Sequence, residues 1–190
     1  MRTIKLLAVI TVSTLMLLSC GGGGSSKQPA TAEGFASIEK EIKNKFGNDA
    51  YFTNMTIIYN KSIGNTISLT VTEAPESLKM GQWNLVNGSW NLNSDITIEV
   101  PEGTKAADFM FQLNDQINLA QLGGLVEKSK KQLTAEKDIK KPMLEMAFVK
   151  FPKNGDKSKT EYVVNLEPEN GGTSFSFYYR LNGELIKMNY

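Results

Sequence analysis

The sequence predicts an α+β fold in which two units, each one helix followed by four antiparallel strands, pack as one compact domain. Apolar residues recur at helical spacing in two segments, one after residue 34 and one after residue 118. After each segment, apolar and polar residues alternate with a period of two, as in antiparallel strands with one solvated face. The order of helix and strands therefore occurs twice, which indicates a possible tandem repeat.

The first helix is predicted from four apolar residues with spacings of three, four and four, namely Phe35, Ile38, Ile42 and Phe46. Gly47 is placed to end it. Lys and Glu occupy the other face. A helix that lies on a membrane carries a basic excess there, so the mixed charge favours packing against a core.

Three alternating runs predict strands in the first unit, at residues 55–59, 67–72 and 96–100. Between the last two runs, Asn87-Gly88 predicts a hairpin, because a type I′ turn needs positive φ at both central residues. This turn would pair Val86 with Ser89, Leu85 with Trp90 and Trp83 with Leu92. Both tryptophans would then share one face.

The second helix has a clear predicted start. Asn118 can cap the first turn, and Gln121 completes a pattern similar to a capping box. The predicted buried side holds Leu119, Leu122, Val126 and Leu133. Gly123-Gly124 weakens the helix by about 1 kcal/mol per glycine relative to alanine, which indicates either close packing against a sheet or a shorter helix.

Four more strands are predicted at residues 143–151, 160–166, 173–181 and 184–190. Asn182-Gly183 predicts a second type I′ hairpin between the last two. The core face of this hairpin is expected to hold Phe175, Phe177, Tyr179, Leu181, Ile186, Met188 and Tyr190.

The two Asn-Gly hairpins are out of phase by one residue. Aligning the turns puts Val86 on Leu181, and a shift of one residue moves every side chain to the other face. Either the two halves share only their element order, or the tryptophans lie on a different face from the one that the second hairpin buries. Burial of the tryptophans is the favoured interpretation, since Asn84 and Asn91 look solvated on the opposite face.

The element order is similar to that of tandem helix-plus-four-strand domains of secreted bacterial proteins, the β-lactamase-inhibitor-like and PepSY-like domains. The similarity covers about residues 35–190. It implies at most a binding or inhibitory role, because a fold does not determine a function.

The N-terminus carries a different signal. Arg2 and Lys5 precede an apolar run at residues 6–18, which at about 20 Å is too short to span a bilayer and is typical of a signal peptide. The run ends in Leu17-Leu18-Ser19-Cys20, which resembles the lipobox of bacterial lipoproteins. The resemblance implies cleavage after residue 19 and a lipid on Cys20, the one cysteine of the chain. An ordinary secretory signal before a free thiol, or an uncleaved anchor, is the alternative.

The resemblance also implies a place in the bacterial cell envelope, with the membrane as partner through the lipid on Cys20. Gly21 is not Asp, which by enterobacterial sorting rules points to the outer membrane. Whether the domain faces the periplasm or the outside stays open. The predicted organisation is a signal peptide at 1–19, a lipidated cysteine and flexible tether at 20–33, a first unit at 34–100 and a second at 101–190.

Composition excludes several classes of function. The 21 Lys and Arg balance 20 Asp and Glu, so no nucleic-acid partner is expected, and the absence of His excludes His-based triads and His-ligated zinc. We expect no metal and no other cofactor. Two carboxylate pairs could suggest a glycosidase or a calcium site, Glu73 with Glu76 and Glu167 with Glu169, but their places next to proline favour solvated turns.

The sequence therefore predicts a non-catalytic binding or assembly module for a protein, peptide or glycan partner, with no catalytic residues. Its candidate surface is the first hairpin, with Trp83, Asn84, Trp90 and Asn91. The alternatives are a structural spacer of the envelope and a hydrolase that works through carboxylates. Solvent exposure of the tryptophans would support the binding surface.

Overall fold

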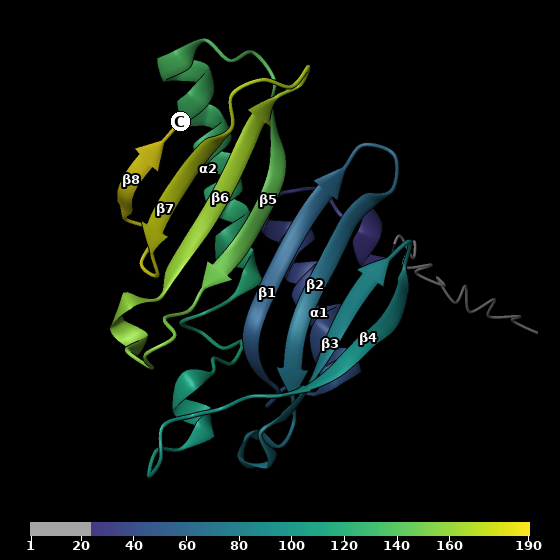
Figure 1. Ribbon diagram of the computed structural model, residues 1–190. Helices are drawn as coiled ribbons and strands as arrows, with labels where there is room; N and C mark the ends of the chain where they lie inside the picture. The colour runs from purple at the N-terminus through teal and green to yellow at the C-terminus, as the bar shows by residue number, and fades with distance from the viewer. Residues whose placement is uncertain (1–23) are drawn as a thin grey trace, which may run out of the picture.

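The computed structural model describes residues 24–190, which form two α-helices and one eight-stranded antiparallel sheet (Figure 1). The predicted α+β class is confirmed. The helices are α1 (Ala32–Phe46) and α2 (Leu119–Lys137). The strands are β1 (Tyr51–Asn60), β2 (Gly64–Thr72), β3 (Lys79–Val86), β4 (Ser89–Thr97), β5 (Pro142–Lys150), β6 (Glu161–Pro168), β7 (Phe175–Arg180) and β8 (Leu185–Asn189).

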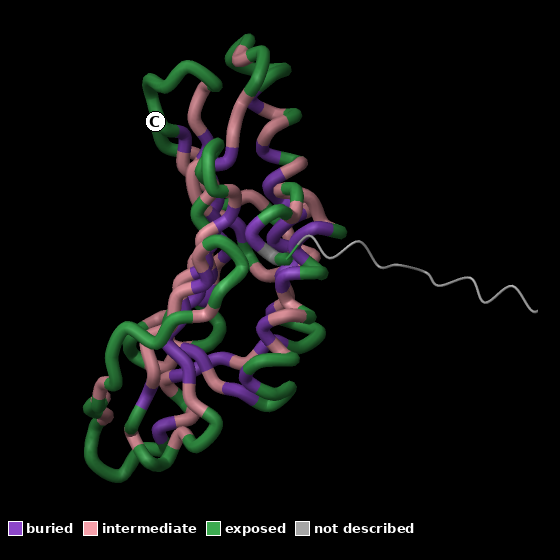
Figure 2. Tube along the Cα trace, turned by 90° about the vertical axis from the view of Figure 1, so that its right-hand side faces the viewer, coloured by how far each residue is buried: buried purple, intermediate pink, exposed green. Residues whose placement is uncertain are grey.

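The strand order in the sheet is β4-β3-β2-β1-β5-β6-β7-β8. The first strand after each helix therefore lies in the middle of the sheet, where β1 pairs with β5. Both helices lie on the same side of the sheet, and buried residues fill the space between the two layers (Figures 1 and 2). One apolar core thus runs under both halves.

The predicted apolar stripes of both helices form part of this core. Phe35 and Ile38 of α1, and Leu122 and Val126 of α2, are fully buried. The two helices pack against each other in antiparallel fashion, and each provides a carboxylate to the other. Glu127 accepts a hydrogen bond from the N–H of Ala32, and Glu39 accepts one from the N–H of Leu119. A negative charge at a helix N-terminus is favourable, because it lies close to free N–H groups.

Of the two hydrogen bonds of the capping box predicted for α2, the one accepted by the Asn118 side chain is confirmed. The side chain of Asn118 accepts from the N–H of Gln121 at 2.8 Å. The reciprocal bond of a capping box does not form, because the Gln121 amide donates to the carbonyl of Leu181. The Asn118 N–H donates instead to the hydroxyl of Tyr162 at 2.8 Å, so that the start of α2 is tied to β6.

The β3–β4 hairpin has the predicted register. Leu85 lies opposite Trp90, and Trp83 lies opposite Leu92. The turn residues have positive φ, 51° for Asn87 and 78° for Gly88, as the sequence pattern requires.

The prediction of a second type I′ turn at Asn182-Gly183 is wrong. Of these two residues only Gly183 has positive φ, at 82°, and it closes a three-residue loop. This extra residue accounts for the phase difference between the two Asn-Gly hairpins. On the helix side lie Trp83 and Trp90 of the first hairpin and Phe175, Phe177 and Tyr179 of the second. Ile186 and Tyr190 are 42% and 75% exposed, so their predicted place in the core is wrong, whereas Met188 packs against it.

The predicted strand at residues 96–100 is only partly correct. Ile96 lies in β4, but the strand ends at Thr97. The residues that follow turn back over the end of the sheet on the side opposite the helices. There a small second apolar cluster surrounds Met80, with Ala106 and Met110 as its other buried members.

The chain before α1 differs from the flexible tether predicted for residues 20–33. Residues 26–31, which we call the strap, pack against the domain. Ser26 is buried, and the carbonyl of Gln28 accepts a hydrogen bond from the side chain of Asn65 at 2.7 Å. The free part of the tether is therefore shorter than the composition indicates.

Three glycines form the seat of the strap. A Cβ atom at Gly64, Gly34 or Gly123 would lie 1.9, 2.0 or 2.2 Å from a carbonyl oxygen of the strap. The close packing predicted around Gly123 is therefore present, but its partner is the strap rather than the sheet. The other predicted consequence, a shorter helix, does not occur, because α2 continues through both glycines.

Cys20 and the predicted signal peptide lie outside the described residues. Within residues 24–190 no helix combines the length and the apolar character that crossing a membrane requires.

Candidate functional site

The predicted surface of Trp83, Asn84, Trp90 and Asn91 is divided between the two faces of the sheet. Both tryptophans point to the helix side, where they hold the ring of Phe46 at centroid distances of 5.5 and 5.1 Å in edge-on geometry. Both are half-buried or nearly so and pack against the core. They thus lie against the core, on the side that the favoured interpretation expects, but neither is among its fully buried residues.

Asn84 and Asn91 lie on the opposite face, where they form a directly opposed cross-strand pair. In residues 24–190 no α-helix covers this face, and only the segment with Ala106 and Met110 packs on one end of it, against Met80; Figure 1 shows the face toward the viewer. We call it the open face. The amide pair is one end of a row of side chains that crosses all eight strands. The members of this central row are Asn91, Asn84, Ser68, Thr56, Phe148, Val163, Tyr178 and Lys187.

The central row changes character where β1 meets β5. On β1 to β4 it carries amides and hydroxyls, and on β5 to β7 it carries Phe148, Val163 and Tyr178. Val163 is 1% exposed although no helix covers it, because its neighbours in the row enclose it. In the adjacent row Ile58, 38% exposed, lies opposite Met146. The open face therefore has an apolar centre beside a polar half.

Cations surround this apolar centre. The ammonium group of Lys187 lies 4.6 Å from the centre of the Tyr178 ring, and that of Lys150 lies at 5.4 Å. Such contacts hold the aliphatic stems of lysine against the ring while the charges stay in solvent. Arg180 follows on the same face of β7, opposite Glu161.

Asn165, next to Met146 on the open face, has a buried side-chain oxygen with no hydrogen-bond partner in the described structure. A buried acceptor without a partner is costly. Rotation of this amide toward a bound molecule would break no internal hydrogen bond of that oxygen.

Two hollows adjoin the open face at the end where β5 and β7 finish. Their volumes are about 550 and 660 Å³, and both are lined by Ser158, Thr160 and Arg180. We call them the basic hollows, because the cations that line one or both are Lys150, Lys153, Lys157, Lys159 and Arg180.

Most of these cations have a carboxylate partner. Lys150 contacts Glu161 at 2.7 Å. Lys159 contacts Asp156 at 3.3 Å, and hydrogen bonds from Ser158 and Lys159 lower the pKa of the Asp156 carboxyl. Exposed pairs of this kind contribute little to stability. Glu161 and Asp115 also line these hollows.

The two carboxylate pairs singled out in the sequence lie apart from these hollows. Glu73 and Glu76 are exposed in the connection after β2. Glu167 lies at the end of β6, and Glu169 contacts Lys141 at 3.3 Å. In the part of the chain that the structure describes, no three His, Cys, Asp or Glu side chains are arranged to hold a metal ion.

Sequence reasoning missed the apolar centre of the open face. A signal was present, because β5 and β7 carry apolar residues at consecutive positions, which face opposite sides of the sheet. Examples are Met146, Ala147 and Phe148 in β5, and Phe177 and Tyr178 in β7. A strand with one solvated face alternates instead. The loss of alternation in β5 and β7 was the sign that these strands carry apolar residues on both faces.

The chain matches no protein-family model, and a comparison with curated proteins finds no significant match.

Proposed function

We propose that the protein is a non-catalytic binding module, anchored to the bacterial cell envelope, that holds a protein or peptide partner on its open face. The anchor is the lipid on Cys20 that the lipobox resemblance implies. The binding role rests on one observation, the partly exposed rings of Phe148 and Tyr178 on either side of the buried Val163, on a sheet face without an α-helix. Aromatic side chains are enriched at protein interfaces relative to the rest of a protein surface.

The chemistry of the face favours one kind of partner. An apolar centre with a polar rim is the usual anatomy of a protein interface, and aromatic residues and Arg are enriched there. Because Lys150, Lys187 and Arg180 line this centre, we expect acidic groups on the partner around an apolar contact. The same arrangement gives no particular advantage to a neutral glycan.

The size of the face is adequate for such a partner. Eight strands at about 4.8 Å spacing extend over roughly 34 Å. A stable interface of standard size needs about 800 Å² on each side, a patch roughly 28 Å across. The open face therefore has room for a complete interface without the edges of the sheet.

We also propose that the chain consists of two structural units, α1 with β1 to β4 and α2 with β5 to β8, which share one sheet. The symmetric strand order about the β1–β5 pair supports this. The reciprocal contacts of Glu39 and Glu127 with the start of the other helix support it as well. In this arrangement the polar and apolar halves of the open face come from different units.

The test is site-specific photo-crosslinking in the full-length chain within the cell envelope. A photoreactive residue replaces Phe148 or Tyr178, and the matched control carries it at Ala36, which is exposed on α1 on the other side of the molecule. We expect one discrete crosslinked species from both open-face positions and none from Ala36. The double substitution Lys150→Glu with Lys187→Glu should reduce its yield at least several-fold.

Two outcomes would contradict the proposal. Equal crosslinking from Ala36 would show that the open face has no special affinity. No crosslinking from Phe148 and Tyr178 in correctly localised protein would favour the structural spacer.

A further inference from the structure

The strap determines where the chain leaves the domain. A Cβ atom at Gly24 would lie 3.9 Å from the Cα of Gly88, so the chain enters the described structure beside the β3–β4 turn. Figure 1 shows the first described residues near this turn, at the right of the sheet. Cys20 precedes Gly24 by four residues, which span at most about 14 Å. A lipid on Cys20 is therefore held close to this turn.

The strap contacts exclude a long tether. If the chain were free up to α1, the twelve steps from Cys20 to Ala32 could extend to about 40 Å. Instead, Ser26 is buried and Asn65 holds the carbonyl of Gln28. The absence of a side chain at Gly64 allows the strap to follow this path, because any side chain there would collide with the strap backbone.

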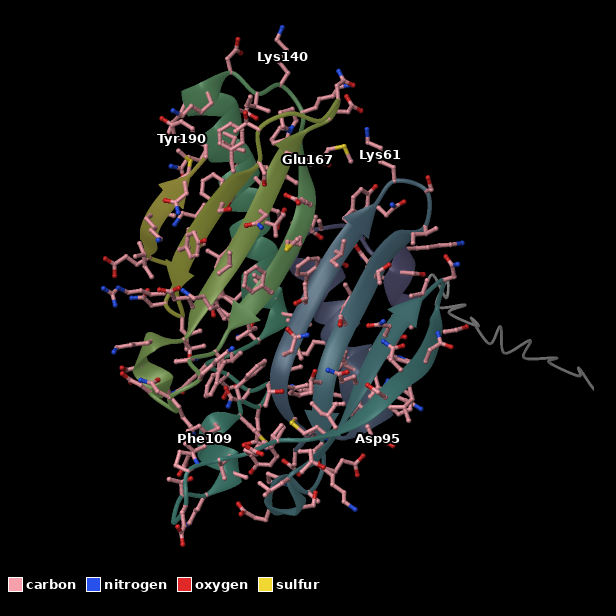
Figure 3. All side chains as sticks on the ribbon, in the orientation of Figure 1. Lys61, Asp95, Phe109, Lys140, Glu167 and Tyr190 are labelled. Atoms are coloured by element: carbon pink, nitrogen blue, oxygen red, sulfur yellow. The ribbon has the colours of Figure 1, made fainter. Side chains whose placement is uncertain are left out.

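The β3–β4 turn belongs to one end of the sheet, which we call the turn end. Figure 3 shows Lys61 of the β1–β2 turn and Lys140 of the α2–β5 connection at this same end, whereas Phe109 and Asp95 lie at the opposite end. A hydrogen bond from Lys61 to the carbonyl of Glu169 joins two of the loops of the turn end.

The turn end has the composition of a surface that meets a bilayer. Ile63 in the β1–β2 turn is 41% exposed, and Lys61, Lys140 and Lys141 are exposed at the same end, where Glu169 pairs with Lys141 and Figure 3 also shows Glu167. Clustered lysines are attracted to anionic headgroups, and an exposed apolar side chain can enter the interface.

We propose that the turn end faces the bilayer and that the basic hollows point away from it. This inference rests on the lipidated Cys20 of the proposed function and adds an orientation to it. The strands then run away from the membrane, and the ten residues of β1 place the far end of the sheet about 30 Å farther out. The open face is presented sideways, where neither the bilayer nor the helices cover it.

The test is energy transfer from the full-length lipidated protein in nanodiscs to an acceptor on the lipid headgroups. Cys20 is the one cysteine of the chain, and lipidation blocks its thiol, so one introduced cysteine gives one labelled site. The donor is placed on Ser62→Cys or Asn87→Cys at the turn end, and the matched control is Lys153→Cys beside the basic hollows. We expect transfer at least several-fold more efficient from the first two positions.

A second variant tests whether the short chain between Cys20 and the strap sets the orientation. Insertion of twelve Gly and Ser residues before Gly24 leaves the strap and its seat unchanged but lengthens the free tether to more than 50 Å. The difference in energy-transfer efficiency between donors at the turn end and the donor at Lys153→Cys should then shrink markedly.

Membrane flotation of the same samples distinguishes the two proposals. Flotation of the unmodified chain together with equal or reversed transfer would overturn the orientation alone. Failure of the unmodified chain to float would overturn the lipid anchor and the orientation with it.

Discussion

At the scale of single residues, Tyr162 connects the sheet to the second helix. Its hydroxyl donates to the carbonyl of Asn118 at 3.1 Å and accepts from the N–H of the same residue. The side chain is fully buried, and this burial raises the pKa of the phenol to about 12. In the unfolded chain a tyrosine titrates near 10. The neutral form is therefore the one that the fold stabilises.

This pKa difference predicts a loss of stability in alkali. Below pH 10 the phenol is neutral in both states and its contribution is complete. As the pH rises from about 10 to about 12 the unfolded chain ionises first, so stability falls, by about 1.4 kcal/mol between pH 9 and 11. Urea unfolding at these pH values should show a smaller fall in Tyr162→Phe than in the unsubstituted chain.

Tyr178→Phe, on the open face, is the matched control and should retain the full fall. At pH 8, Tyr162→Phe should be less stable by about 1 to 3 kcal/mol, because the N–H of Asn118 loses its partner. An unchanged alkaline fall in Tyr162→Phe would contradict this account.

Two adjacent glycines of α2 predict opposite effects of the same substitution. Alanine within a helix normally stabilises by about 1 kcal/mol relative to glycine. Gly124→Ala should follow this rule, since its Cβ would meet only the Cβ of Ala32, at 3.9 Å. Gly123→Ala should destabilise by about 1 kcal/mol or more, because its Cβ would lie 2.2 Å from the carbonyl oxygen of Thr31.

Thermal unfolding of the two alanine variants measures this difference directly, and limited proteolysis shows whether the strap has lifted. We expect faster cleavage within residues 24–31 in Gly123→Ala only. Equal stabilisation by both substitutions would mean that the strap does not press on α2.

At the scale of the elements, local patterns predicted much of the fold. The stripe of α1 and the register of β3 with β4 follow from short-range rules, since helical spacing and an Asn-Gly turn are each contained in about ten residues. The strap could not be predicted in this way. Its composition is that of a linker, and it is held by Gly64 and Gly123, which are distant in the sequence.

The candidate site was predicted only in part. Asn84 and Asn91 lie on the open face as expected, but the tryptophans next to them do not, because α1 covers their side of the sheet. Phe148 and Tyr178 complete the central row only through the β1–β5 pair, which joins strands about 90 residues apart. Long-range pairing of this kind leaves no local pattern.

The position of α1 over the first hairpin predicts the tryptophan emission. Phe46 packs edge-on against both Trp83 and Trp90, so the emission should be blue-shifted and protected from acrylamide. Phe46→Ala should move the emission to the red and cost about 3 to 5 kcal/mol of unfolding free energy. Red-shifted, strongly quenched emission from the unsubstituted chain would contradict the packing of α1 on this hairpin.

At the scale of the whole molecule, the two helices and the sheet form one body. Only three residue pairs join β1 to β5, but the apolar core is continuous across this join. Each helix also provides a carboxylate that accepts a hydrogen bond from an N–H group at the start of the other helix. The core is therefore continuous across the boundary at residue 100 that the sequence predicts between the two units. Each half relies on the other for part of its buried surface.

The shared core predicts a single unfolding transition. Urea unfolding followed by tryptophan fluorescence, which reports on the first hairpin, should coincide with unfolding followed by far-UV circular dichroism. The fragments 24–100 and 101–190 should each fail to fold alone. Two separated transitions, or a folded fragment, would contradict one cooperative unit.

The sheet ends in two strands that each have one unpaired side, β4 and β8. Copies joined head to tail through these edges would form no closed ring, and such contacts build fibres. β4 carries polar residues and a register shift, and β8 has five residues with Lys187 among them. Short, charged or irregular edges resist such pairing. The open face can thus stay broad and available for the proposed partner, while the edges of the same sheet oppose the joining of copies into fibres.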